Sequence, residues 1–326
     1  MRATFTQEQL EIAKTVRSLA EGERVTARAA LDGGWQAPAC DGPLLRDFGL
    51  LGVPEQAGGI GSDLIDLLVA VEVLGEHLVP SRFPAHAAAV QLLSGGGPLP
   101  EDVLAGERVL TPAVDASGAG AGLVRYAAQA DGLAVLLPGR VGIAPVEGVV
   151  ARQSVDPSVP LADVTLAEPA KVAPPGTGPW RATLVVAAEL CGVAQGAIDL
   201  AAEQARTREQ FGRVIGSYQG VAFQLAEAAT VRKAAWDLTL YAGWAVDNGR
   251  PDAELQVHAA KAAAGRAAVF AAERCIQVHG GMGITMEADP HLFLRRALVL
   301  DALLGSGAWH RRQVGALRVA ARQARP

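Results

Sequence analysis

A guanidinium, an aromatic ring and a flexible glycine stand together in the segment Arg208-Glu209-Gln210-Phe211-Gly212. A planar guanidinium makes forked contacts with phosphate oxygens, and a phenyl ring can lie against an adenine or a flavin. The same residues also fit a simpler arrangement, in which an arginine at a helix end pairs with the neighbouring glutamate. Taken alone, the segment does not choose between a phosphate-bearing ligand and a local ion pair.

Three glycines in Gln277-Val278-His279-Gly280-Gly281-Met282-Gly283 form a second such segment, and Gln219 lies between the two in sequence. Backbone without side chains lets a pyrophosphate or an adenosine approach closely. The glycines do not follow a predicted strand, so a Rossmann dinucleotide fingerprint fits poorly. We interpret His279 as a packing or surface residue rather than an acid–base group, because the sequence offers it no evident acidic partner.

The composition limits the class of protein that can present these segments. The 326 residues are 50% hydrophobic but only 5% aromatic, which favours closely packed helices with an Ala, Val and Leu core. A net charge of -5 with scattered basic residues argues against nucleic acid as a partner. The three cysteines have no metal-ligand spacing, so we expect no metal site and a reduced, cytoplasmic compartment. Because the first ten residues are polar and no apolar run approaches the ~20 residues of a membrane span, we expect neither a signal peptide nor a membrane segment.

The N-terminal third is predicted to be helical. A capping box at 6–9 predicts a helix over 7–21, and a second helix is predicted around 44–48. The glycine-rich segment 58–61 fits a turn between helices better than a ligand contact. Ser62 is predicted to cap a strongly apolar helix over 64–78.

The remaining sequence predicts a small β region followed by a helical bundle. Short Val- and Leu-rich runs separated by turn signals, such as 130–132, extend over 109–174 and end at a proline-rich linker. Long helical patterns follow, the last with a possible break at 305–307. We therefore predict a mainly α protein with a small β insert and a C-terminal four-helix bundle. The predicted domains are 1–108, 109–174 and 175–326, and the predicted bundle helices are 182–206, 217–248, 252–279 and 289–325.

Taken together, these segments resemble the acyl-CoA dehydrogenase family. The N-terminal half adds weaker support in the segment 48–54 followed by Gly58-Gly59. The resemblance covers nearly the whole chain and implies FAD held across a dimer interface. The residues that carry it in the C-terminal half are Arg208-x-x-Phe211-Gly212, Gln219 with Phe223-x-Leu225-Ala226-Glu227, Gln277-x-x-Gly280-Gly281-x-Gly283 and Arg295.

The resemblance also implies a role for most of these residues. In that family the arginine loop and the double-glycine loop bind the adenosine and pyrophosphate half of the FAD that belongs to the neighbouring subunit. By resemblance, this role falls here to Arg208, Phe211, Gln219, Gln277, Gly280 and Gly281.

The chain departs from the family where the catalytic base is expected. Family members remove the α-proton of an acyl thioester with the glutamate of a Glu-Gly-Thr segment, and this chain reads Leu304-Gly305-Ser306 there. Leu304 replaces the base, whereas Ser306 keeps the hydroxyl and a predicted flavin contact. Other members carry the base on the first bundle helix, where this chain has Ala182 and Thr183.

Two carboxylates remain near these positions in sequence. Glu189 lies in an apolar run of the first bundle helix, and burial there suits a general base, but it is ~10 Å further along the axis than Ala182. We favour a structural or interface role for Glu189 and keep catalysis as the alternative. Asp301 precedes Leu304 by one helical turn and is interpreted as solvated or salt-bridged.

The middle region is shorter than the family's β domain. The segment 110–114 runs almost directly into 115–120, without the Thr- and Ser-rich stretch that cradles the flavin ring in the family. We therefore expect the flavin-ring half of the site to be missing from this chain.

These matched losses suggest a division of labour between two chains. Similar short chains without the base occur in heteromeric acyl-CoA dehydrogenases of actinobacterial type, some acting on steroid side-chain thioesters. Our first hypothesis is a subunit of an α2β2 enzyme, whose partner supplies the glutamate and much of the acyl-CoA site and which passes electrons to an electron-transfer flavoprotein. The alternatives are a homomeric enzyme with a relocated base, Glu189, and a non-catalytic assembly subunit.

Overall fold

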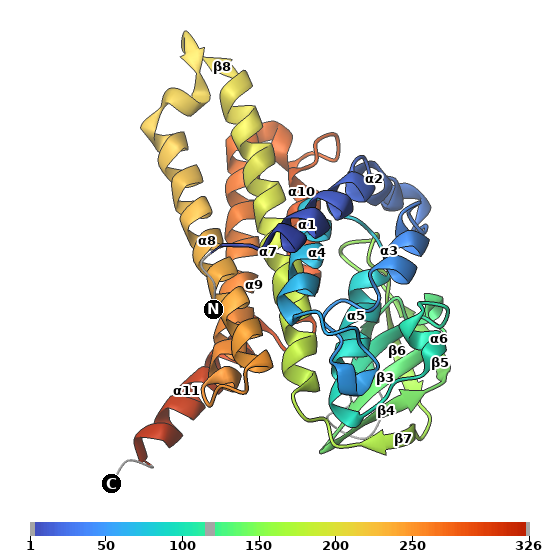
Figure 1. Ribbon diagram of the computed structural model, residues 1–326. Coiled ribbons are helices and arrows are strands. Elements are labelled where there is room, and N and C mark those ends of the chain that lie inside the picture. Colours follow the sequence, from blue (N-terminus) through green and yellow to red (C-terminus); the bar gives the residue numbers. More distant parts are fainter. Residues whose placement is uncertain (1–3, 115–120, 324–326) are drawn as a thin grey trace.

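The computed structural model describes residues 4–114 and 121–323, and the chain is mainly helical with a small β region (Figure 1). The predicted fold class is therefore confirmed. The segment 115–120, which the sequence prediction assigned to the shortened flavin-ring region, lies outside the described residues. The N-terminal helices are α1 (Gln7–Ala20), α2 (Arg24–Gly33), α3 (Asp41–Asp47), α4 (Leu64–Glu76), α5 (Phe83–Leu93) and α6 (Glu101–Leu104), with the 3-10 turns η1 (Glu55–Ala57) and η2 (Ser94–Gly96).

The N-terminal caps of α1 and α4 were both predicted from the sequence. The predicted capping box of α1 is present, because the Thr6 side chain accepts from the Gln9 backbone and the Gln9 side chain accepts from Thr6. The predicted cap of α4 is wrong by one residue. Asp63 caps that helix, and the Ser62 hydroxyl instead accepts the Gly52 N–H at 2.7 Å.

The glycine-rich turn before α4 is shaped by contacts within the chain. Gly58 adopts φ +96°, a conformation that L side chains rarely take. A Cβ atom on Gly59 would lie 1.7 Å from the Val53 carbonyl oxygen. Both glycines are therefore required by the turn itself, as the sequence analysis favoured.

Two small sheets form the β region. One has the order β1-β3-β4-β7 with β1 and β3 parallel, and the other has the order β2-β6-β5. The turn signal at 130–132 does not join paired strands, since β2 and β3 belong to different sheets. Ala and Val side chains from both sheets pack between them. The strands are β1 (Leu110–Val114), β2 (Ala121–Arg125), β3 (Gly132–Leu137), β4 (Arg140–Ala144), β5 (Val146–Arg152), β6 (Leu161–Leu166) and β7 (Ala170–Ala173), with the 3-10 turn η3 (Ala127–Gln129) after β2.

Long helices make up the C-terminal bundle (Figure 1). The predicted break at 305–307 is confirmed, because Leu304 and Gly305 have φ values of +53° and +101° and end the helical path. The helices are α7 (Gly178–Thr207), α8 (Gln219–Asp247), α9 (Ala253–His279), α10 (Pro290–Ala302) and α11 (Gly307–Gln323), joined in part by β8 (Glu209–Gln210), β9 (Arg213–Val214), η4 (Ile215–Ser217) and η5 (Gly280–Ile284).

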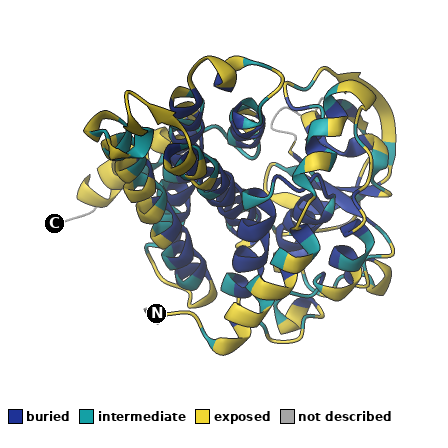
Figure 2. Cartoon of the chain, turned by 90° about the horizontal axis from the view of Figure 1, so that it is seen from above, coloured by how far each residue is buried: buried dark blue, intermediate teal, exposed yellow. Residues whose placement is uncertain are grey.

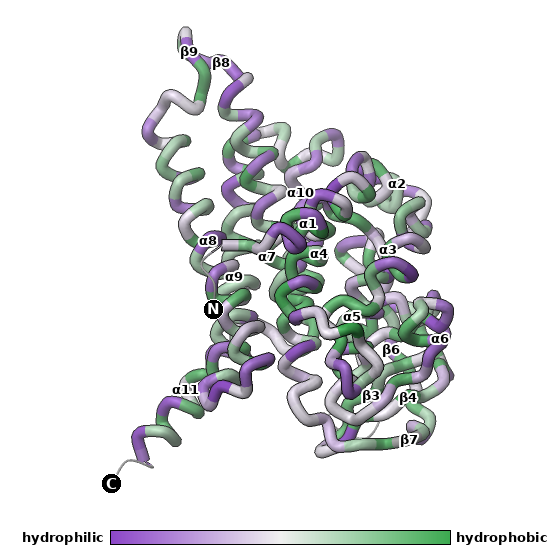
Figure 3. The backbone as a smooth tube through the Cα atoms, viewed as in Figure 1, coloured by the Kyte–Doolittle hydropathy of each residue, from purple (hydrophilic) through white to green (hydrophobic). Residues whose placement is uncertain are grey.

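Helix α7 is the central element of the core. It packs against α4, α5, α8, α9 and α10, and Figure 2 shows buried residues concentrated at the centre with exposed residues on the outer faces. Hydrophobic positions run along α4, α5 and α7 (Figure 3). The helix is long and apolar enough to cross a membrane, but 78% of its most apolar window is buried inside the protein. We therefore describe α7 as the core helix of the bundle.

Helices α4 and α7 approach each other at backbone distance. A Cβ atom on Gly192 would lie 1.9 Å from the Glu72 carbonyl oxygen, and one on Gly196 would lie 2.1 Å from that of Glu76. A Cβ atom on Gly75 would lie 2.2 Å from the Glu189 carbonyl oxygen. Glycine at these three positions fixes how closely the N-terminal helices pack on the bundle.

The Gly192→Ala substitution tests this contact. Because the new methyl group has no space, α4 and α7 must separate, and we expect the free energy of unfolding to fall by about 3 kcal/mol. Gly315→Ala on α11 is the matched control, since a Cβ atom there meets nothing within 4 Å. It should be neutral or stabilise by about 0.5–1 kcal/mol. Urea unfolding measures both, and equal stability of the two variants would contradict the packing described.

Candidate functional site

The turn between α10 and α11, residues 303–306, is held in place by a buried lysine. The Lys261 ammonium, fully buried, donates to the carbonyl oxygens of Asp301 at 3.0 Å and Gly305 at 3.1 Å. Burial lowers the pKa of Lys261 to about 8, against the opposing effect of the Asp301 carboxylate. Asp301 also accepts the Gly307 N–H at the start of α11. These contacts fix the position of Leu304 relative to α9.

A histidine pair supports the same turn. His310 Nε2 lies 3.1 Å from the Leu304 carbonyl oxygen, and its Nδ1 lies 2.7 Å from Nδ1 of His258. Burial lowers the pKa of both rings, and that of His310 falls to about 3. The Trp309 ring stands edge-on to both imidazoles. The pair is therefore a buried, neutral element of the turn at ordinary pH.

This turn forms one wall of a cavity of about 790 Å³. The cavity brings together the predicted positions Ala182, Thr183, Leu304 and Ser306, which come from α7 and from the turn before α11. Neither Leu304 nor Ala182 carries a group that can accept a proton. Among the described residues that line the cavity, Glu254 alone has a carboxylate.

Sequence reasoning did not identify Glu254 or His258. They lie one turn apart on α9, and an acidic residue followed four positions later by a histidine is the signal that the sequence offered. Their significance depends on the approach of α11, which no local pattern predicts.

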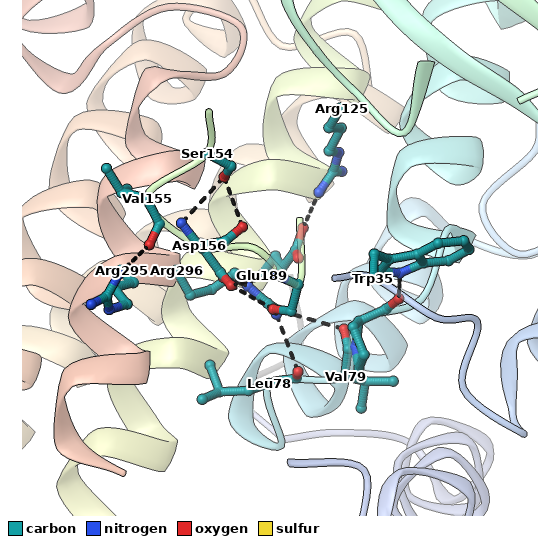
Figure 4. Close-up of polar contacts among 12 residues, drawn as sticks. Trp35, Leu78, Val79, Arg125, Ser154, Val155, Asp156, Glu189, Arg295 and Arg296 are labelled. Carbon is teal, nitrogen blue, oxygen red and sulfur yellow. Dashed lines mark hydrogen bonds and ion pairs between the residues drawn. The ribbon is translucent and has the colours of Figure 1, made fainter. Parts of the chain in front are cut away.

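Glu189 does not line this cavity. The residue is 3% exposed, and its carboxylate accepts a hydrogen bond from Arg125 Nη1 at 2.7 Å (Figure 4). Arg125, from β2, is 2% exposed and does line the cavity. Two other nitrogens of its guanidinium, Nε and Nη2, are buried without a hydrogen-bond partner in the described part of the chain. Glu189 is thus engaged as the counter-ion of Arg125.

A second buried arginine lies nearby. Arg296, on α10, donates to the Asp156 carboxylate at 2.5 Å, to the Ser158 hydroxyl and to the carbonyls of Leu78 and Val79 (Figure 4). The neighbouring Arg295, which the sequence analysis singled out, points the other way and donates to the Val155 carbonyl. Arg296 therefore ties α10 to the β region and to the segment after α4.

The arginine loop projects from the far end of the bundle as the β8–β9 hairpin (Figure 1). Arg208 and Phe211 are exposed, and the Phe211 ring is 93% exposed with φ +55°. The Tyr218 hydroxyl donates to the Gln210 or Phe211 carbonyl, and the Arg213 guanidinium covers its ring at 4.0 Å. In the described part of the chain, Arg208 forms no ion pair with Glu209. The local ion pair that the sequence analysis kept as the simpler arrangement is therefore not seen in the structure.

The double-glycine loop lies at the same end of the bundle. Gln219, Gln277, Gly280 and Gly281 are all exposed, and a Cβ atom on either glycine would meet nothing within 4 Å. Gly280 has φ +62°. His279 is buried instead, with Nδ1 2.8 Å from the Cys275 carbonyl, which fits its predicted packing role.

Ser306 is separated from these exposed residues. It lies past the C-terminal end of α10, whose 13 residues span about 20 Å, whereas the double-glycine loop precedes the start of that helix. The predicted cofactor residues therefore form two groups, with Ser306 at the cavity and the other six at the end of the bundle.

Comparison with known proteins shows which family this chain resembles. Residues 181–317 match the family model described as acyl-CoA dehydrogenase, C-terminal domain. Acyl-CoA dehydrogenase IpdE2 of Mycobacterium tuberculosis is 33% identical over 75% of this chain and 75% of its own length. The chain belongs to the acyl-CoA dehydrogenase family.

Other family members and solved structures extend the match. Acyl-CoA dehydrogenase FadE34 of Mycobacterium tuberculosis is 34% identical over 96% of this chain, but the chain spans only 48% of the length of FadE34. The ChsE4-ChsE5 complex from Mycobacterium tuberculosis contains a chain with the same fold (TM-score 0.83, 22% identity, full coverage of both chains). A chain of the Tcur3481-Tcur3483 steroid ACAD G363A variant superposes with a TM-score of 0.82 and 25% identity, covering 98% of this chain and 99% of that chain.

Family membership implies FAD, and the exposed end of the bundle fits its phosphate-bearing half. The Arg208 guanidinium is exposed and has no side-chain partner in the described part of the chain, so it is open to phosphate oxygens, and Gly280 and Gly281 leave their backbone open to close approach. In the described residues, no group of three or more His, Cys, Asp or Glu side chains is arranged to hold a metal ion.

The ion pair of Arg125 and Glu189 yields a stability prediction. Glu189→Gln leaves a buried guanidinium without its counter-ion, so we expect a loss of about 3–5 kcal/mol in the free energy of unfolding. Arg140→Gln is the matched control, because its pair with Glu168 is exposed and should contribute at most about 1 kcal/mol. Chemical unfolding of both variants measures the difference. A Glu189→Gln variant as stable as the wild type would show that the pair does not hold the core.

Proposed function

We propose that this chain is the subunit that lacks the family's catalytic glutamate in a heteromeric, FAD-dependent acyl-CoA dehydrogenase. One observation carries the proposal. The residues suited to another subunit's FAD stand exposed at the end of the bundle, whereas the cavity of this chain has Leu304 and Ala182 at the positions of the family's base.

In this proposal the partner supplies the catalytic glutamate. That carboxylate would remove the α-proton of the acyl thioester, and the chemistry that bound FAD would supply is acceptance of the β-hydride, which leaves an enoyl thioester. This chain contributes orientation and electrostatics: Arg208 neutralises phosphate charge, and Gly280 and Gly281 admit the pyrophosphate. Electron-transfer flavoprotein is our proposed acceptor.

The relatives support a two-chain assembly. FadE34 leaves about half of its own length unmatched by this chain, and the name of the ChsE4-ChsE5 complex gives two chains. We propose an α2β2 arrangement with a second acyl-CoA dehydrogenase-like chain. The steroid ACAD named among the similar structures supports a steroid side chain as the acyl group.

The relocated base that the sequence analysis kept open is weaker as an alternative. Glu189 is engaged by Arg125 at 2.7 Å and does not line the cavity. A subunit that only stabilises its partner remains the second candidate, and the 93% exposed Phe211 ring would fit such a role as an interface contact.

Expression of this chain alone and together with a second, glutamate-bearing family member tests the assembly. We expect FAD loading and turnover only in the co-expressed complex. Full FAD loading and turnover by this chain alone would overturn the proposal.

The Arg208→Ala substitution tests the contribution to FAD within the complex. Loss of a charged contact to phosphate is worth about 1.5–3 kcal/mol, so we expect FAD affinity to fall about 10- to 150-fold. Arg206→Ala is the matched control, because Arg206 lies two residues away and is engaged with Glu203 on the helix surface. Equilibrium release of FAD, followed by fluorescence, measures both. Unchanged affinity in Arg208→Ala would favour the assembly-only role.

A further inference from the structure

The histidine pair beside the cavity has its protons fixed by one carbonyl group. The Leu304 carbonyl oxygen can only accept, so the His310 Nε2 atom 3.1 Å away carries a hydrogen. In a neutral imidazole the other nitrogen is then bare, and His310 Nδ1 accepts from Nδ1–H of His258 at 2.7 Å. His258 Nε2 is therefore the nitrogen of the histidine pair that carries no hydrogen and accepts no hydrogen bond within the pair.

The free nitrogen belongs to a residue of the cavity wall. His258 lines the cavity together with Leu304 and Ala182, and in the described part of the chain its Nε2 has no hydrogen-bond partner. His258 is 8% exposed as a whole residue, and its ring stands edge-on to that of Trp309, with ring centres 5.4 Å apart. An unpartnered acceptor on a fixed ring is arranged to receive a proton from a bound molecule.

Two further groups of the same cavity suit this chemistry. Glu254, one turn before His258 on α9, is half-buried and stabilises positive charge on that ring. Arg125 is paired with Glu189, but two nitrogens of its buried guanidinium have no partner in the described part of the chain, and their N–H groups can donate to negative charge developing on a bound molecule. The volume of about 790 Å³ is in the range of cavities that hold a small organic ligand.

We propose that His258 is a proton acceptor in this chain's own cavity and removes the α-proton of an acyl thioester bound there. The Cα–H bond breaks, the proton goes to His258 Nε2, and the electron pair forms an enolate with its charge on the thioester oxygen. Return of the proton regenerates the substrate, so the step requires no oxidant. The inference rests on the acyl-thioester class of the proposed function, but not on the partner's glutamate.

Exchange of the α-hydrogen in D₂O tests the step without any flavin reduction. The full chain is used in the assembly in which it purifies, with the glutamate of any partner replaced by glutamine. Octanoyl-CoA and a steroid side-chain acyl-CoA are the probes, and mass spectrometry measures deuterium incorporation. We expect exchange above the buffer rate, a fall of about 100-fold or more in His258→Gln, and full exchange in the control His291→Gln, which lies outside the cavity.

Either of two results overturns the inference: no exchange above the buffer rate with both probes, or equal exchange in His258→Gln. The proposed function fails separately, through FAD loading and turnover by this chain alone. Thermal unfolding shows whether His258→Gln is folded.

The pH dependence gives a second measurement that needs no His258 variant. Exchange requires the neutral ring, so its rate should fall as the pH decreases through the pKa of His258, which burial holds below its ordinary value of 6.5. The Glu254 carboxylate raises that pKa, so Glu254→Gln should move the acidic limb of the profile to lower pH. An unmoved limb counts against the inference. Other charged or titratable groups at the cavity and the histidine pair are His310 and Arg312 on α11, Lys261 on α9, Asp301 on α10 and Arg125 on β2.

Discussion

The buried guanidinium of Arg296 is the interaction on which the arrangement of the three parts depends. A charged group 1% exposed is costly unless its donors are satisfied, and here its partners come from different parts of the chain. Asp156 and Ser158 belong to the β region, and the carbonyls of Leu78 and Val79 follow α4. The geometry of α10, and so of the turn that follows it, is correct only when all three parts have come together.

Arg125 and Glu189 form a second arrangement of this kind. Both are almost fully buried, and they join β2 to the central helix α7. Two buried arginines, each with its own carboxylate, keep the interior close to neutral while fixing the β region against the bundle. Specificity of docking is what such pairs contribute here, since an apolar contact of equal size would tolerate sliding.

Much of the fold could be predicted from the sequence, because helix periodicity, caps and breakers are local signals. The capping box at Thr6, the break at Gly305 and the long bundle helices all followed from neighbouring residues. Strand pairing could not be predicted from neighbouring residues, because the strands on either side of the turn signal at 130–132 belong to different sheets. The candidate site was likewise predicted only in part. Loops with recognisable spacing were found, but the partners of Arg125, Arg296 and His258 lie 64, 140 and 52 positions away in sequence, beyond the reach of any local pattern.

The glycine contacts between α4 and α7 have a mechanical consequence. Helices that touch backbone to backbone at Gly75, Gly192 and Gly196 have no side-chain layer that could shear, so the N-terminal helices and the bundle move as one rigid body. The cavity is partly open in this structure, and its other walls include β2 and the first turn of α11. The outer part of α11 is largely exposed and projects from the bundle (Figure 1), so this helix lies outside the backbone contact that the three glycines make.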